Sequence, residues 1–229
     1  MSRILATLDE RERASERFFD HWAKSYEERR ISPWFRFTQH LAIDHLGLHP
    51  DSALLDVGCC TGYAVRVAAA MMPEGRASGI DISAAMLERA RTKLEPDIRE
   101  RVEFCQANAA NIPYPDATFS HLLCTSSFHH YPDPGRALQE MKRVLVPGGK
   151  LVVFENAPEL SWYTWMWDRI LRLVEKGHVR YYPTNELEGL IARAGFENLT
   201  LHHRRNYFMH HGKLFASVQL WGAWRPLAP

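Results

Sequence analysis

Ala53-Leu-Leu-Asp-Val-Gly-Cys-Cys-Thr-Gly62 is the stretch of sequence that decides the fold. An apolar run at 53–57 predicts a strand, a glycine-rich turn follows, and residues 63–72 read as a helix rich in Ala and Val. A strand that enters a helix through such a turn is typical of a nucleotide-cofactor site, because glycines let the backbone approach the ligand and the helix start offers free N–H groups. The turn lacks the G-x-G-x-x-G spacing, so alone it is a weak signal.

The rest of the chain alternates short apolar runs with helical segments, which predicts a mostly parallel sheet. Further strands are expected at 76–81, 102–107, 121–125, 150–154, 197–203 and 213–221, and helices at 83–94, 136–146 and 184–194. An amphipathic helical stretch at 8–37 precedes them, and Pro147-Gly-Gly149 is expected to form a turn. We therefore predict an α/β fold, with a Rossmann-like seven-stranded sheet, helices on both faces and antiparallel closing strands.

We expect one domain over residues 1–229. Within it, 1–50 would form an N-terminal helical lid, 51–155 the cofactor-binding core, and 156–229 an acceptor-lid insertion with the closing strands.

The composition excludes several classes of protein. Of the 229 residues, 46% are hydrophobic and 24% charged, which argues against disorder, and the net charge of +1 argues against nucleic acid as a partner. The first residues lack a signal-peptide core and no apolar run approaches the ~20 residues of a membrane span. The four cysteines match no zinc or disulfide pattern. We expect a cytoplasmic monomer or homodimer with reduced thiols.

Two acidic residues narrow the chemical class of the expected ligand. Asp56 stands two residues before Gly58, where a negative charge is unfavourable beside a pyrophosphate and favourable beside an ammonium or sulfonium group. Asp81 ends the second strand, where a carboxylate can accept hydrogen bonds from ribose hydroxyls. The alternative for each is a structural one, as a cap of the following helix.

Four motifs in order carry a resemblance to a known family. They are Asp56–Gly62, Gly79-Ile-Asp-Ile-Ser83, Ala107-Asn-Ala-Ala-Asn-Ile-Pro-Tyr-Pro-Asp116 and Arg143-Val-Leu-Val-Pro-Gly-Gly149. Together they resemble the class I S-adenosylmethionine-dependent methyltransferases, most of all the branch that includes the ubiquinone/menaquinone C-methyltransferases. The resemblance covers roughly residues 15–155 and implies S-adenosyl-L-methionine as the cofactor.

The resemblance also implies cofactor-binding residues. The expected set is Tyr26, Asp56, Gly58, Cys59, Cys60, Gly62, Asp81, Ile82, Met86, Asn108, Ala109 and Thr125. The chain departs from the family pattern at Cys60, where Gly is usual, and at Asn108, where Asp is frequent. A side chain at residue 60 is expected to crowd the cofactor, and Asn108 would accept from the adenine amino group without charge assistance.

The acceptor end is expected after the fourth strand. His130 and His129 are the candidate catalytic bases, with packing against the cofactor as the alternative role. The aromatic-rich segment 156–183 would supply the pocket, which favours a small aromatic or lipid-like methyl acceptor. No carboxylate–histidine spacing calls for a metal, so none is expected.

Rival functions remain open from the sequence. A non-catalytic cofactor sensor or partner subunit is favoured by Cys60 and Asn108. A nicotinamide oxidoreductase is opposed by Asp56 and by the missing pyrophosphate glycines. Methylation of a thiol-bound metalloid would use the cysteines, yet Cys59 and Cys60 fall in the cofactor turn.

Overall fold

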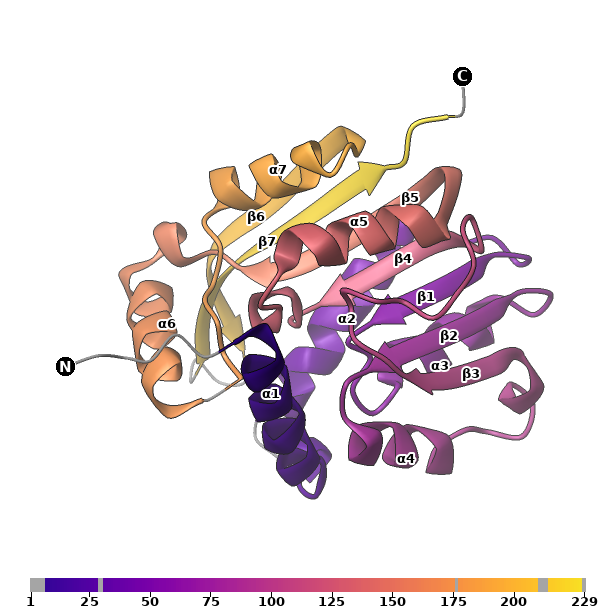
Figure 1. The fold of residues 1–229 in the computed structure, drawn as a ribbon, viewed down its shortest axis with the longest axis horizontal. Coiled ribbons are helices and arrows are strands. Elements are labelled where there is room, and N and C mark those ends of the chain that lie inside the picture. Colours follow the sequence, from indigo (N-terminus) through magenta and orange to yellow (C-terminus); the bar gives the residue numbers. More distant parts are fainter. Residues whose placement is uncertain (1–6, 29–30, 176, 210–213, 228–229) are drawn as a thin grey trace.

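The computed structural model describes residues 7–28, 31–175, 177–209 and 214–227. Its strands form one seven-stranded sheet in the order β3-β2-β1-β4-β5-β7-β6 (Figure 1). The strands are β1 (Ala53–Val57), β2 (Arg76–Asp81), β3 (Val102–Gln106), β4 (Phe119–Thr125), β5 (Leu145–Asn156), β6 (Glu197–Met209) and β7 (Leu214–Trp224). The first five are parallel, whereas β7 runs antiparallel to both β5 and β6. The predicted fold class is confirmed.

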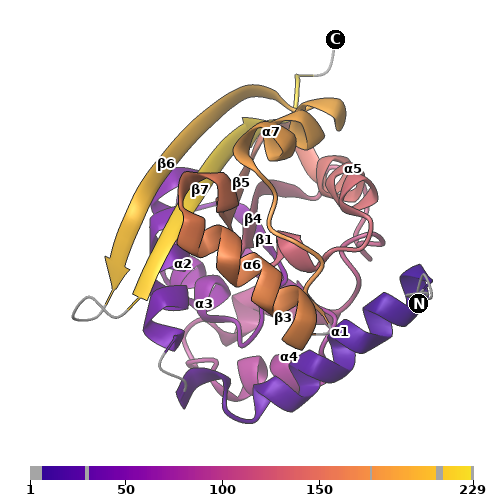
Figure 2. The same ribbon diagram turned by 90° about the vertical axis from the view of Figure 1, so that its left-hand side faces the viewer.

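Helices cover both faces of the sheet. They are α1 (Leu8–Ala23), α2 (Ser32–Leu46), α3 (Tyr63–Met71), α4 (Ala84–Thr92), α5 (Pro134–Val144), α6 (Trp162–Val174) and α7 (Thr184–Arg193), with short 3-10 turns η1 (Tyr26–Glu28), η2 (Arg99–Arg101), η3 (Phe128–His130) and η4 (Pro158–Leu160). Helices α2, α3 and α4 share a core with one face, and α5 and α7 share a core with the other. Helices α1 and α6 lie across the carboxyl ends of the parallel strands (Figures 1 and 2).

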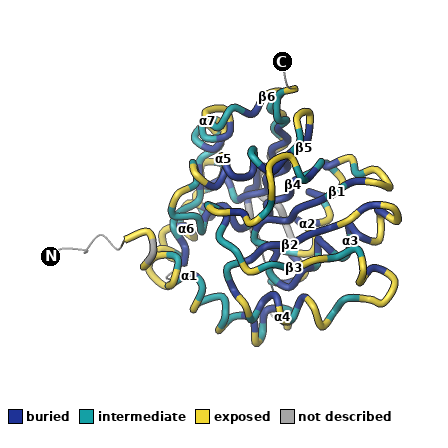
Figure 3. Tube along the Cα trace, turned by 45° about the vertical axis from the view of Figure 1, so that its right-hand side comes forward, coloured by how far each residue is buried: buried dark blue, intermediate teal, exposed yellow. Residues whose placement is uncertain are grey.

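Strand β1 shows why the sheet lies inside. Leu54 and Leu55 are both fully buried, and they belong to the cores on opposite faces. Successive strand residues point to opposite faces, so a strand covered on both sides is a continuous apolar run. Burying one such leucine contributes about 1.5–3 kcal/mol. In Figure 3 the buried residues lie mostly in the central strands, and the exposed residues lie mostly in the outer helices and loops.

The structure corrects three predictions of secondary structure. The stretch 8–37 is not one helix: α1 ends at Ala23, and α2 starts afresh with Pro33 in its first turn, where the missing N–H costs no helical hydrogen bond. Helix α6 was not predicted, because aromatic residues are weak helix formers and those of α6 do not follow a single apolar stripe. The expected turn at 147–149 lies within β5.

In the described parts of the chain, no helix is both long enough and apolar enough to cross a bilayer.

The turn between β1 and α3 requires its glycines for packing. Gly58 and Gly62 have φ of 83° and 70°, in the left-handed region that side chains disfavour. A Cβ at Gly58 would lie 2.6 Å from Cβ of Ser127, and one at Gly62 would lie 2.5 Å from Cζ of Phe104. The turn therefore lies against the neighbouring strand ends with no room for a methyl group.

We predict that Gly62→Ala destabilises the fold more than Gly47→Ala. Both glycines have a φ of 70°, but a Cβ at Gly47 meets nothing within 4 Å. The control should lose about 1–2 kcal/mol from backbone strain alone, and Gly62→Ala about 1–3 kcal/mol more from overpacking against Phe104. Urea unfolding measures both, and equal losses would show that the turn has spare space.

Candidate active site

A cavity of about 360 Å³ opens at the carboxyl ends of the parallel strands. Its walls come from segments far apart in the sequence: α1, η1, the start of α2, the ends of β1, β2 and β4, η3, α6 and the segment before α7. In open α/β sheets this edge is where ligands bind.

At one end of the cavity, Asp81 joins the turn to the second strand. Its Oδ2 accepts a hydrogen bond from the backbone N–H of Cys60 at 2.8 Å, and its Oδ1 accepts one from Ser83 at 2.9 Å. Burial raises the pKa of Asp81 to about 6 despite these bonds. The carboxylate therefore holds the turn against the residue before α4 but does not cap that helix, whose N-cap is Ser83, and it also lines the cavity. Its two oxygens retain lone pairs for hydroxyl donors.

Behind the same wall, Asp56 is buried without compensation. Neither of its carboxylate oxygens has a hydrogen-bond partner among the described residues, and burial, with the charge of Asp81 adding to it, raises its pKa to about 8. Its neighbours Val57 and Gly58 line the cavity, whereas Asp56 itself does not. An enclosed carboxylate is stable only as the neutral acid or beside a positive charge. A cationic ligand at the turn fits this requirement.

The structure brings together most of the predicted site residues. Those on the cavity wall are Tyr26, Gly58, Cys60, Asp81, Ile82, Asn108, Ala109, Thr125, His129 and His130. Asp56, Cys59, Gly62 and Met86 do not line it. Cys59 is buried in the core formed with α2, α3 and α4. Met86 packs with Tyr26 in a separate small core and does not itself line the cavity.

The two departures from the family pattern have local consequences. Cys60 adopts a φ of 49°, a conformation that favours glycine. Burial raises the pKa of its thiol well above the usual value, which opposes a nucleophilic role. Oδ1 of Asn108 already accepts a 2.9 Å hydrogen bond from the N–H of Ala110. One of the two lone pairs of this oxygen is therefore in use, which leaves the other for the adenine amino group.

The N-terminal segment is attached to this end of the cavity. Oδ1 of Asp20 accepts from the hydroxyl of Ser83 at 2.6 Å, and Glu27 accepts from Thr61 at 2.7 Å. Between these anchors Tyr26 stacks on Phe35 with ring centroids 5.7 Å apart. Helix α1 and η1 therefore close the cavity over the β1 turn.

At the other end of the cavity, His129 pairs with a buried carboxylate. Its Nδ1 lies 2.8 Å from Oε2 of Glu155, whose Oε1 accepts from the N–H of Phe128. Burial raises the pKa of Glu155 to about 7, and burial together with His178 lowers the pKa of His129 well below its usual value. Above pH 7 the pair is therefore a neutral imidazole beside a carboxylate.

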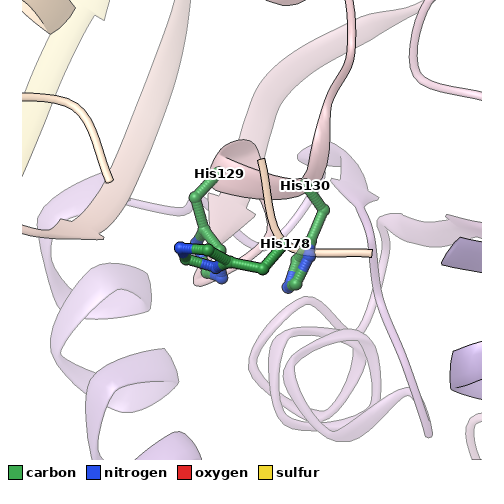
Figure 4. Close-up of side chains that lie close together, drawn as sticks. All are labelled: His129, His130 and His178. Carbon is green, nitrogen blue, oxygen red and sulfur yellow. The ribbon is translucent and has the colours of Figure 1, made fainter. Parts of the chain in front are cut away.

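His130 and His178 complete a cluster of three imidazoles (Figure 4). His130 places Nδ1 3.0 Å from the carbonyl of Gly177, and burial lowers its pKa. His178 places Nε2 2.9 Å from Oδ1 of Asp168 on α6. The structure adds Glu155, Asp168, Glu175 and His178 to this end of the cavity, and no local spacing in the sequence connects these four residues to His129 and His130.

Aromatic and aliphatic side chains form the wall between the two ends. They are Phe19, Trp22, Trp34, Phe35, Trp167, Leu171 and Tyr181. They come from α1, α2, α6 and the segment before α7, so the expectation that 156–183 lines the pocket agrees with the position of Trp167, Leu171 and Tyr181.

The sequence of this chain is similar to those of known methyltransferases. A family model described as a methyltransferase domain matches residues 55–153. The 27-O-demethylrifamycin SV methyltransferase of Amycolatopsis mediterranei is 36% identical over 71% of this chain and 60% of its own length, so the match spans less than two thirds of that relative. A ubiquinone/menaquinone biosynthesis C-methyltransferase of Serratia proteamaculans is 32% identical over 73% of each chain.

A solved structure shows the same fold. The crystal structure of a possible histamine N-methyltransferase of Thermotoga maritima matches with a TM-score of 0.72 and 23% identity, over 92% of this chain and 99% of that one. With the ordered motifs, the sheet order and the cavity, these matches show that the chain belongs to the class I S-adenosylmethionine-dependent methyltransferases.

Proposed function

We propose that the chain binds S-adenosyl-L-methionine in the cavity and transfers its methyl group to a small acceptor that is largely apolar. The observation that carries the proposal is a single cavity with two chemically different ends. Buried carboxylates lie at the β1–β2 end, and neutral imidazoles among aromatic rings lie at the other.

The carboxylate end suits the cofactor. Asp81 offers lone pairs to the ribose hydroxyls, and Asp56 supplies a negative charge behind the turn that approaches the methionine part. Ile82 and Ala109 add apolar surface for the adenine. These roles extend the predictions from the sequence. Asp56 would act by its charge from behind the cavity wall, because it does not line the cavity itself.

The imidazole end suits the acceptor. Trp167, Leu171 and Tyr181 give a broad apolar surface next to His129 and His130. Two relatives are named as a 27-O-demethylrifamycin SV methyltransferase and a ubiquinone/menaquinone biosynthesis C-methyltransferase, and by analogy we infer an acceptor with an aromatic or lipid-like body.

Bound S-adenosylmethionine supplies a methyl group that is already activated by its sulfonium. The lone pair of the acceptor atom forms the new bond to the methyl carbon, the carbon–sulfur electron pair stays on sulfur, and any acceptor proton passes to a base. The chain's residues hold the two reactants in line and exclude water. His129 and His130 are neutral at pH 7, the form that a base requires, and their predicted catalytic role stays a prediction.

The second candidate, a non-catalytic cofactor sensor, is favoured by Cys60 on the cavity wall. Turnover separates the two functions. The protein is incubated with S-adenosylmethionine and a panel of phenols, hydroquinones and hydroxylated polyketides, and both S-adenosylhomocysteine and methylated products are followed by mass spectrometry. The enzyme reading expects one acceptor class to give equal amounts of both. Binding without turnover over the whole panel favours the sensor.

We predict that Asp81→Ala weakens binding of S-adenosylmethionine and of S-adenosylhomocysteine by roughly 1–3 kcal/mol, because ribose hydroxyls lose an acceptor. Isothermal titration measures both affinities. Glu88→Ala, on the exposed side of α4, is the control and should bind both as the wild type does. Unchanged affinity in a folded Asp81→Ala variant would remove this residue from the site.

We also predict that cofactor binding weakens as the pH falls from 8 to 6. The raised pKa of Asp56, about 8, means that the free protein holds a proton there, and a cationic ligand favours its release. Affinity should therefore drop by up to roughly tenfold per pH unit below that pKa.

Asp56→Asn is the matched control for this pH dependence. It cannot ionise, so its binding should be weaker at pH 8 and should change less between pH 8 and 6, while titration of the ligand's own amino group contributes to both proteins alike. The same pH dependence in both would show that Asp56 does not sense the ligand's charge.

A further inference from the structure

We propose that His129, His130 and His178 bind one divalent transition metal ion of the zinc class at the acceptor end of the cavity. Each histidine offers one ring nitrogen, and these three nitrogens lie within 4.8 Å of one another (Figure 4). The sequence led us to expect no metal, because no carboxylate–histidine spacing called for one. His178 lies far along the chain from the other two histidines and is brought close to them by the segment that follows α6.

One nitrogen of every ring is held by a partner that fixes the ring, which leaves the other nitrogen for a metal. Nδ1 of His129 meets Glu155 at 2.8 Å, Nδ1 of His130 meets the carbonyl of Gly177 at 3.0 Å, and Nε2 of His178 meets Asp168 at 2.9 Å. Metal-ligating histidines almost always donate their other N–H to a carboxylate or a backbone carbonyl. All three rings have this arrangement.

Nδ1 of His178 is the observation that points to a ligand. The atom is enclosed and has no hydrogen-bond partner in the described part of the chain. With Nε2–H donated to Asp168, this nitrogen carries a lone pair. Leaving a buried acceptor unsatisfied costs about 1–3 kcal/mol, and coordination to a metal would satisfy it.

The ligand set indicates the type of metal. Imidazoles without thiolates suit zinc, copper, nickel and iron, and three histidines with an open fourth position are a known catalytic zinc arrangement. Zinc–nitrogen bonds of about 2.0–2.1 Å require the three nitrogens to approach to roughly 3.4 Å. The separations of up to 4.8 Å would therefore shorten by small movements of the three side chains when the metal binds.

The inference rests on the proposed function and narrows its acceptor. His129 and His130 line the cavity, and Glu175 lies 3.7 Å from Nε2 of His130. A metal with an open position there would hold an acceptor oxygen and lower the pKa of its hydroxyl group, with Glu175 beside it to take the proton. The expected acceptor is therefore a phenol or enol, and the two histidines act as ligands.

Metal content tests the proposal directly. The protein is purified without a histidine tag, stripped with a chelator and dialysed against zinc chloride at low micromolar concentration, and its zinc is measured by mass spectrometry. We expect one zinc per chain in the wild type. We expect His178→Gln to lose at least about 100-fold in affinity, since even an outer partner of a ligand contributes 10- to 100-fold.

The double variant His210→Gln/His211→Gln is the control for zinc held by other histidine pairs and should keep one zinc. Loss of zinc in this control but not in His178→Gln, or a wild type without stoichiometric zinc, would overturn the proposal. If His178→Gln fails to fold, cobalt substitution of the wild type decides: visible bands of tetrahedral cobalt support the site, and their absence refutes it.

Titration of S-adenosylhomocysteine into the stripped and the zinc-loaded protein keeps the two proposals apart. His178 does not line the cavity, so His178→Gln should bind S-adenosylhomocysteine as the wild type does. Failure of the wild type to bind this ligand would count against the proposed function and leave the zinc result unaffected.

Discussion

Two carboxylates that are buried at the ends of adjacent parallel strands are the constraint on which the site depends. Asp56 lies in β1 and Asp81 ends β2, and the register that pairs Asp56 with Gly79 brings the two to one edge of the sheet. Burial raises the pKa of both, with the charge of Asp81 adding to the rise at Asp56 and the charge of Asp20 adding to the rise at Asp81. Such a pair is relieved by a proton, a cation or hydroxyl donors, and a sulfonium nucleoside offers the last two. The turn, its glycines and the N-terminal helix are arranged around that pair.

The far end of the cavity depends on a different kind of contact. His129 follows β4 and lies beside Glu155, near the end of the neighbouring strand β5. Asp168 lies on α6 and pairs with His178, in the segment after that helix. Parallel strands share their carboxyl ends, so the first pair follows from the topology of the sheet. The second pair depends on how one helix packs over the strand ends. Under the proposed function, the acceptor end of the cavity therefore depends on the packing of α6 and of the residues that follow it.

The sequence predicted the parts of the molecule that follow from local pattern. Apolar runs located every strand, and the glycine turn with Asp81 indicated the edge of the sheet where the cavity opens. It could not tell which residues of the turn face the cavity, because that depends on the backbone conformation of the turn: Cys60 takes a left-handed φ and lines the cavity, whereas its neighbour Cys59 is buried in the core.

The remaining features depend on contacts between residues that are far apart in the sequence, so local pattern does not predict them. His178 meets His130 across 48 positions of sequence with no motif to connect them. Helix α6 carries Trp162 and Trp165 on its exposed side and Thr164 and Trp167 on the cavity side, so its aromatic residues do not follow a single apolar stripe. Both features require the folded chain to be recognised.

A crystal structure of the protein with S-adenosylhomocysteine is the most direct measurement. The account predicts electron density for the ribose hydroxyls within hydrogen-bond distance of Asp81, with the sulfur beside the turn at Gly58 and Cys60. Density for the nucleoside at any other place, or a turn closed by the Cys60 thiol with the ligand excluded, would contradict it.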